Sequence, residues 1–108
     1  MKPATATAIL LFLAACGTPL PPEKSAYVGT WDGPQQHVLT ISQSGRSRYW
    51  KGSSRVEGPI QKWEGDNFTV GLGPINTMYV VSVPPHQVDG RWRMTVDGVE
   101  LVKRNAPP

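Results

Sequence analysis

Turn-forming residues recur at short intervals between residues 26 and 104, and this spacing constrains the possible fold more than any other feature. The chain contains 11 glycines and 11 prolines, and both residue types interrupt helices. No stretch between them keeps a 3.6-residue apolar period long enough for a helix. Runs with β-strand character lie there instead, at residues 27–31, 37–43, 48–51, 56–63, 68–72, 78–83, 92–96 and 99–103. The pattern predicts an all-β domain.

Each pair of neighbouring runs is separated by few residues, and most of the separations carry turn chemistry. The turn motifs are Asp32-Gly33-Pro34, Ser44-Gly45, Gly65-Asp66-Asn67, Gly73-Pro74, Pro84-Pro85, Asp89-Gly90 and Asp97-Gly98. Connections this short join antiparallel neighbours, because parallel strands need a long crossover. We therefore predict a small antiparallel meander barrel of about eight short strands, with a β-sandwich as the alternative.

The last two runs form the most sharply defined hairpin. Asp97-Gly98 is a two-residue type I′ turn signal, and it pairs Val96 with Val99. The same register pairs Met94 with Leu101 and Trp92 with Lys103. The apolar members of these pairs then share one face, whereas Arg91, Arg93, Thr95, Glu100 and Arg104 fall on the other.

The amino-terminal residues have the order of a secretory signal. Lys2 supplies a positive charge, residues 8–13 form a short apolar run, and small residues precede a single cysteine. That apolar run is too short to span a bilayer, which takes about 20 residues. The quartet Leu13-Ala14-Ala15-Cys16 resembles the lipobox of bacterial lipoproteins. This resemblance implies cleavage before Cys16 and acylation of Cys16, with the bilayer as a partner; a plain secretory signal is the alternative.

These features divide the chain into four parts. Residues 1–15 are the predicted lipoprotein signal peptide, 16–25 a lipidated Pro-rich tether of extended chain, 26–104 the β domain, and 105–108 a disordered tail. Gly17 follows the cysteine without an acidic residue, a pattern that in Gram-negative lipoproteins is compatible with the outer membrane. Removal of Lys2 leaves a net charge of +2, which is too weak to favour nucleic acid as a partner. We expect a monomer facing the periplasm.

The first run of the β domain contains Gly29-Thr30-Trp31, which resembles the Gly-x-Trp element that opens lipocalins. The resemblance implies that Trp31 lies at the closed end of a barrel, with a basic residue of the last strand packed across it. Lys103 or its neighbour Arg104 is the candidate for that role. A barrel of about eight strands can be filled by side chains or hold one small ligand. Trp31, Trp92 and Lys103 are therefore candidates for core or for pocket lining, and the short strands favour core.

A second cluster combines arginine with aromatic residues at Arg46-Ser47-Arg48-Tyr49-Trp50-Lys51. Strand alternation places Arg46, Arg48 and Trp50 on one face and Tyr49 on the other. Guanidinium groups beside an exposed aromatic ring suit anionic or sugar-like partners, through bidentate hydrogen bonds and stacking. The alternative is a solvated hairpin in which the arginine stems cover Trp50.

The sequence offers little on which catalysis could be built. His37 and His86 are far apart and lie outside any nucleophile motif, and no spacing of zinc ligands or phosphate-cradling loop is present. We therefore expect no enzyme, no metal site and no cofactor. The predicted function is a structural or accessory binding module for a protein or an anionic envelope component. The alternative is a carrier of a small apolar ligand with a lipocalin-like pocket.

Overall fold

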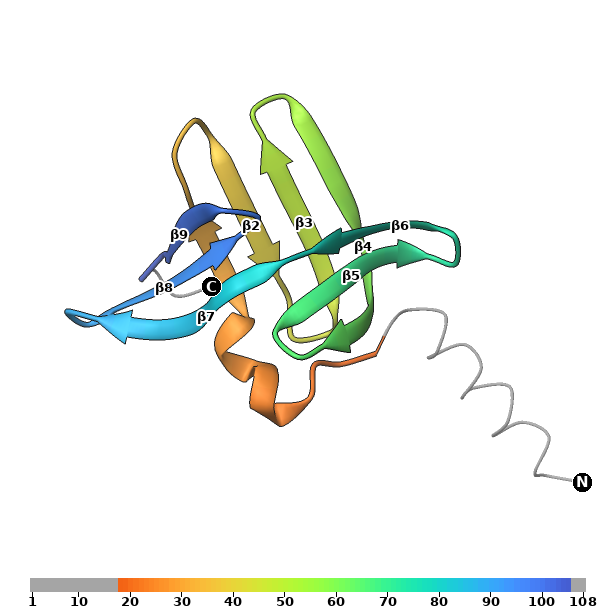
Figure 1. The fold of residues 1–108 in the computed structure, drawn as a ribbon, viewed down its shortest axis with the longest axis horizontal. Helices are drawn as coiled ribbons and strands as arrows, with labels where there is room; N and C mark the ends of the chain where they lie inside the picture. Colours follow the sequence, from red (N-terminus) through yellow and green to blue (C-terminus); the bar gives the residue numbers. More distant parts are fainter. Residues whose placement is uncertain (1–17, 106–108) are drawn as a thin grey trace, which may run out of the picture.

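The computed structural model describes residues 18–105, which form one antiparallel sheet of nine strands curled into a half-barrel (Figure 1). The strands are β1 Gly29–Asp32, β2 His37–Ile41, β3 Arg46–Lys51, β4 Ser54–Glu64, β5 Asn67–Leu72, β6 Ile75–Tyr79, β7 Val81–Val88, β8 Arg91–Val96 and β9 Val99–Lys103. Their order in the sheet is β6-β5-β4-β3-β2-β1-β9-β8-β7. The predicted all-β meander is confirmed. Residues 1–17 and 106–108, which include the predicted signal peptide, Cys16 and most of the predicted tail, lie outside the described residues.

The ninth strand arises because the predicted run 78–83 is two strands with a break at Val80. β6 pairs with β5, whereas β7 pairs with β8 at the opposite edge of the sheet. The Asp97 turn holds both backbone groups of Val80: the Asp97 amide donates to the Val80 carbonyl at 2.8 Å, and the Val80 amide donates to Asp97 Oδ1 at 2.9 Å. β6 and β7 are thus consecutive in the chain, although they form the two opposite edges of the sheet.

The prediction of a turn at Pro84-Pro85 is wrong, because both prolines lie inside β7. The pairing of β7 with β8 shifts register between Val83 and His86, around the two prolines. Proline has no amide hydrogen, and sheets tolerate it at bulges and on edge strands. β7 provides both conditions, since it lies at one edge of the sheet.

The register of the carboxyl-terminal hairpin agrees with the sequence prediction. Val96 pairs with Val99 and Met94 with Leu101. Asp97 and Gly98 have φ of 48° and 80°, and positive φ at both central residues defines the predicted type I′ turn. Because side chains alternate between faces, this turn directs Met94 and Leu101 into the core, where both are fully buried.

The core fills the inner face of the curled sheet. Every core side chain is at most 7% exposed: Leu20, Tyr27, Trp31, Leu39, Ile41, Tyr49, Ile60, Phe68, Val70, Tyr79, Val81, Met94, Val96 and Leu101. Partly buried apolar side chains pack against this cluster, among them Trp63 and Trp92. The inner face is thus closed by aromatic and aliphatic side chains contributed by most of the strands.

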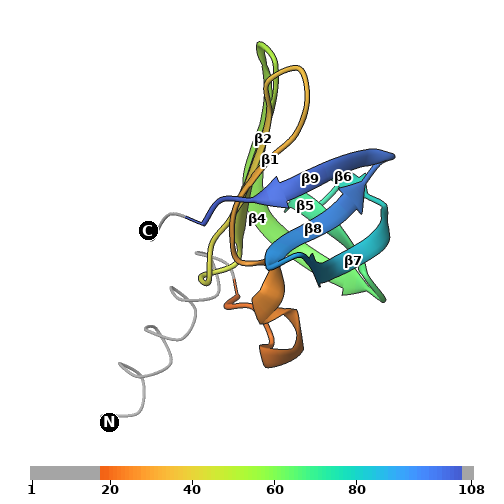
Figure 2. The same cartoon turned by 90° about the vertical axis from the view of Figure 1, so that its left-hand side faces the viewer.

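The segment predicted as an extended tether is instead packed on the domain. Leu20 is 5% exposed, and its amide donates to the Gln43 carbonyl at 3.1 Å. A short 3-10 helix, η1, follows at Pro22–Tyr27, with proline at its first turn. Figure 2 shows η1 beneath the strands, at one end of the half-barrel. Burial of Leu20 and Tyr27 accounts for the packing of this segment against the domain.

Candidate functional site

The outer face of β3 presents the arginine cluster found in the sequence. Arg46, Arg48 and Trp50 are exposed, and they alternate with Ser47 and Tyr49, which are buried. The neighbouring strand β4 runs antiparallel, with Arg55 opposite Trp50. The Arg55 guanidinium carbon lies 5.1 Å from the centre of the Trp50 ring. Trp50 keeps 36% of its surface exposed. The ring is therefore accessible to solvent next to the Arg55 guanidinium.

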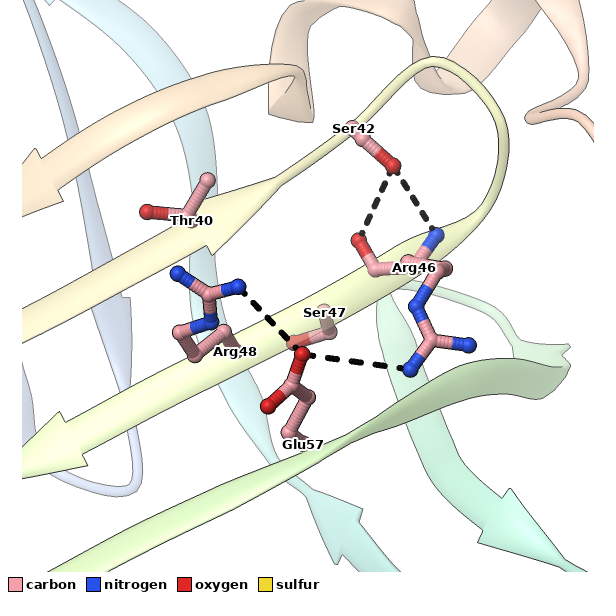
Figure 3. Close-up of a pocket in the computed structure, with 6 residues that line it drawn as sticks. All are labelled: Thr40, Ser42, Arg46, Ser47, Arg48 and Glu57. Atoms are coloured by element: carbon pink, nitrogen blue, oxygen red, sulfur yellow. Dashed lines mark hydrogen bonds and ion pairs between the residues drawn. The ribbon is translucent and has the colours of Figure 1, made fainter.

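Glu57 lies among these arginines, and the sequence analysis missed it. Its carboxylate oxygens lie 3.3 Å from Arg48 Nη2, 3.7 Å from Arg55 Nε and 3.9 Å from Arg46 Nη2. Figure 3 shows Glu57 reaching between Arg46 and Arg48. The β3–β4 register places Glu57 opposite Arg48. The sequence did contain a signal for Glu57. A two-residue hairpin turn at Gly52-Ser53 would have paired Glu57 with Arg48.

We call the set Arg46, Arg48, Trp50, Arg55 and Glu57 the arginine patch. Three guanidinium groups share one carboxylate, which leaves the patch with a net charge of +2. About half of the surface of each arginine side chain is exposed. Ion pairs as exposed as these contribute about 1 kcal/mol or less to stability. The arginines therefore remain available to a second anionic group.

The arginine patch borders a shallow cavity that carries hydroxyl groups. The cavity has a volume of about 210 Å³ and is lined by Thr40, Ser42, Arg46, Ser47, Arg48 and Glu57 (Figure 3). The Ser42 hydroxyl is held near the β2–β3 turn, where it accepts a hydrogen bond from the Arg46 amide at 3.2 Å. Hydroxyl and guanidinium donors beside one another suit the oxygens of a phosphate or a carboxylate.

The residues predicted as core or pocket lining come together on the inner face. Trp31 is fully buried, and its Nε1 donates to the Tyr27 carbonyl at 2.9 Å. Lys103 Nζ lies 5.1 Å from the Trp31 ring and 5.2 Å from the Trp92 ring, and it donates to the Ala26 carbonyl at 2.8 Å. Burial lowers the pKa of Lys103. These contacts describe a packed core in which Lys103 lies over both rings and donates a hydrogen bond to the Ala26 carbonyl.

Gly29 makes room for this arrangement. A Cβ atom at Gly29 would lie 3.2 Å from the aliphatic stem of Lys103, and its φ of 140° is one that other residues rarely adopt. Arg104, the other candidate for the position over Trp31, points elsewhere and donates to Asp32 at 2.7 and 2.9 Å. Those hydrogen bonds lower the pKa of Asp32. Lys103 is thus the basic residue that covers Trp31.

Each of the two histidines contacts a backbone carbonyl of its own chain segment. His37 Nδ1 lies 2.6 Å from the Pro34 carbonyl, and His86 Nδ1 lies 3.0 Å from the Pro84 carbonyl. Within residues 18–105, no three His, Cys, Asp or Glu side chains gather in a way that could hold a metal ion. No helix of that same region combines the length and the apolar character of a membrane span.

Comparison with protein-family models, with curated proteins and with solved structures finds no match for this chain. Its function must therefore be inferred from its own residues. Two groups of side chains differ in their chemistry. The arginine patch is exposed and has a net positive charge, whereas the Trp31–Lys103 cluster is packed on the inner face. The arginine patch is therefore the group of these two that solvent can reach.

Proposed function

We propose that the protein is an envelope lipoprotein that acts as an accessory binding module, with the arginine patch holding an anionic envelope component or the acidic surface of a protein. The observation that carries the proposal is the arrangement of Arg46, Arg48 and Arg55 around the single carboxylate of Glu57. Guanidinium groups bind carboxylates and phosphates in a bidentate geometry. The neighbouring Trp50 ring adds a surface for stacking.

The alternative function, a carrier of small apolar ligands, has less support. Such a carrier needs an open apolar cavity beside Trp31 and Trp92. Trp31 has no exposed surface, and the Lys103 amine lies 5.1 Å from its ring and 5.2 Å from the Trp92 ring. Three cavities among the described residues lie at the outer face of β3 and β4, between β4 and the β5–β6 hairpin, and beside Thr18. Neither tryptophan lines any of these three.

The membrane anchor is the second part of the proposal, and it rests on the lipobox ending in Cys16. Acylation of Cys16 would attach the protein to a bilayer, with the outer membrane of a Gram-negative envelope as the proposed location. The test is metabolic labelling with palmitate in cells that express the wild type or Cys16→Ser. We expect label in the wild type alone. Equal labelling of both proteins would remove the anchor and most of the proposed location.

The binding role is tested by charge reversal in the arginine patch. Mature lipoprotein carrying Arg48→Glu is compared with Arg91→Glu, which makes the same change of net charge on the exposed start of β8. Partners are captured by crosslinking in cells, and purified peptidoglycan and lipopolysaccharide serve as defined probes. We expect Arg48→Glu to lose the partner or probe that the wild type and Arg91→Glu retain. Equal retention, or equal loss, by both variants would contradict a role for this patch.

A further inference from the structure

The chain enters the domain at a fixed point rather than through a free linker. Thr18 lies against Gly45 in the β2–β3 connection, so closely that a Cβ atom on Gly45 would overlap the Thr18 carbonyl. Two residues later Leu20 is buried, and its amide is hydrogen-bonded to Gln43. The face of the domain around Thr18 is therefore the face from which the preceding residues depart.

Cys16 precedes Thr18 by two residues. A fully extended chain spans about 3.5 Å per residue, so at most about 7 Å separates the two positions. If Cys16 carries acyl chains in a bilayer, the region around Thr18 lies at the level of the lipid headgroups. The domain is then held against the membrane with one face toward it.

The β5–β6 hairpin tip, consisting of Leu72, Gly73, Pro74 and Ile75, lies on this same face. Gln61 connects the two sites: its Nε2 donates to the Gly73 carbonyl at 3.1 Å, and it lines one cavity together with Thr18. In Figure 1 the tip and the start of the described chain both lie on the right-hand side of the molecule.

The hairpin tip carries the most exposed large apolar side chains of the described region. Leu72 is 69% exposed and Ile75 is 80% exposed. Both line a groove of about 480 Å³ together with Arg46, whose side chain is 49% exposed. Apolar side chains that can enter the headgroup boundary, next to a cation that can pair with lipid phosphates, are the combination that binds membrane surfaces.

We propose that the β5–β6 hairpin tip docks into the phospholipid surface to which Cys16 is anchored, with Arg46 at the headgroups. This inference rests on the lipid anchor of the proposed function and adds a defined orientation to it. β3 and β4 lead away from the Thr18 face to the turn at Gly52 and Ser53, at the top of Figure 1. The docked domain would present the Trp50 and Arg55 end of the arginine patch to the aqueous side.

The orientation is tested on the full lipidated chain reconstituted in vesicles of phosphatidylethanolamine with a minority of phosphatidylglycerol. An environment-sensitive fluorophore is attached at Ile75→Cys or, as the matched control, at Ser53→Cys on the exposed β3–β4 turn. Vesicle flotation isolates the anchored protein, and lipids with quenchers near the headgroup report the depth of each fluorophore. Circular dichroism checks that both variants keep their β structure.

We expect the Ile75→Cys label to shift to the blue and to be quenched by lipid several-fold more than the Ser53→Cys label. If the protein floats but both labels report water, the docking inference is overturned while the lipid anchor stands, and the hairpin tip is left open to a protein partner. If the protein does not float, the anchor itself fails, and the docking inference falls with it. Equal quenching at both positions would likewise contradict a fixed orientation.

Discussion

Trp31 lies on the inner face of the sheet and Trp50 on its outer face. Both rings have a cationic side chain beside them, but they differ in their exposure to solvent. Each ring lies 5.1 Å from a cationic group, Lys103 Nζ for Trp31 and Arg55 for Trp50. Trp31 has no exposed surface, whereas Trp50 is 36% exposed. A cation over an aromatic ring is thus no indication of function by itself. Its surroundings decide whether it stabilises the fold or remains available to a partner.

The hydrogen bonds of the two cations make the difference concrete. The Lys103 amine is partly buried, donates to the Ala26 carbonyl and has a lowered pKa because burial disfavours its charge. Arg55 is half exposed, lies over the Trp50 ring and forms an ion pair with Glu57, which two other arginines share. The inner cation ties the last strand to the residues before the first, whereas the outer cations lie half exposed at the surface.

Trp31→Ala tests the inner face most directly. The change removes a fully buried ring and its hydrogen bond to Tyr27, and it leaves the Lys103 amine over a cavity. We expect a loss of about 3–5 kcal/mol in the free energy of unfolding, as for other large core truncations. Urea unfolding followed by circular dichroism measures it. A loss below about 1 kcal/mol, the size of effect expected at exposed positions, would remove the contrast between the two tryptophans.

Gly98→Val tests the turn that sorts side chains between the two faces. Gly98 has φ of 80°, a conformation that a β-branched residue adopts only under strain, although the space around it is open. We expect a loss of about 1–3 kcal/mol in the free energy of unfolding. The control is Gly98→Asn, which tolerates positive φ and should cost less. Equal stability of the valine variant and the wild type would show that the turn does not require this conformation.

Tyr49→Phe tests the inner neighbour of Trp50. The hydroxyl groups of Tyr49 and Tyr79 are buried without a hydrogen-bond partner among the described residues, and burial raises the pKa of each to about 12. The folded state therefore holds these protons more tightly than the unfolded state, and stability falls as the pH rises above about 10, the ordinary pKa of tyrosine. Lys103 acts in the opposite direction, because its pKa is lowered.

We expect Tyr49→Phe to leave stability unchanged near neutral pH or to raise it by about 1 kcal/mol, because an unsatisfied hydroxyl disappears. The variant should also weaken the fall in stability above pH 10, as measured by urea midpoints across the alkaline range. Tyr49→Ala is the companion variant, since it removes the ring as well as the hydroxyl. A strong loss of stability for Tyr49→Phe at neutral pH would mean that the hydroxyl has a partner.

Trp50→Ala tests the outer face, and we expect a cost of about 1 kcal/mol or less. The ring is partly exposed, and its contact with the Arg55 guanidinium is of a kind that is weak at exposed sites. The same variant should lose the partners that the wild-type lipoprotein captures by crosslinking, since aromatic residues commonly anchor interfaces. A stable variant that keeps every partner would move the binding face elsewhere, and an unfolded variant would place Trp50 with the core.

Glu57→Gln should have the smallest effect on stability. Unlike Trp50→Ala, it should strengthen binding. Its three ion pairs are partly exposed, so their loss costs about 0.5 kcal/mol. Without the carboxylate, the three guanidinium groups lose their internal competitor. Binding of an anionic probe should strengthen on the order of threefold at low salt, and the gain should shrink as salt screens the charges. Weaker binding would mean that Glu57 itself contacts the ligand.

The agreement between sequence and structure is best where the information is local. Strand alternation is sufficient to place Arg46, Arg48 and Trp50 opposite Tyr49, because the side-chain period of a strand is two wherever the strand lies. Asp97-Gly98 specifies its hairpin for a similar reason, since positive φ at both central residues limits the turn to one geometry. These features depend on backbone geometry within a few residues, so the sequence alone determines them.

The remaining features depend on partners that are distant in the chain, so they form only when the whole domain assembles. The break at Val80 depends on Asp97, and the packing of Leu20 depends on Gln43 in the β2–β3 connection. The position of Lys103 over Trp31 depends on the pairing of the last strand with the first. The packed entry segment shows the physical reason: Leu20 and Tyr27 have no apolar surface to cover until the sheet curls. Burial in a core is a property of the assembled chain, and no local pattern specifies it.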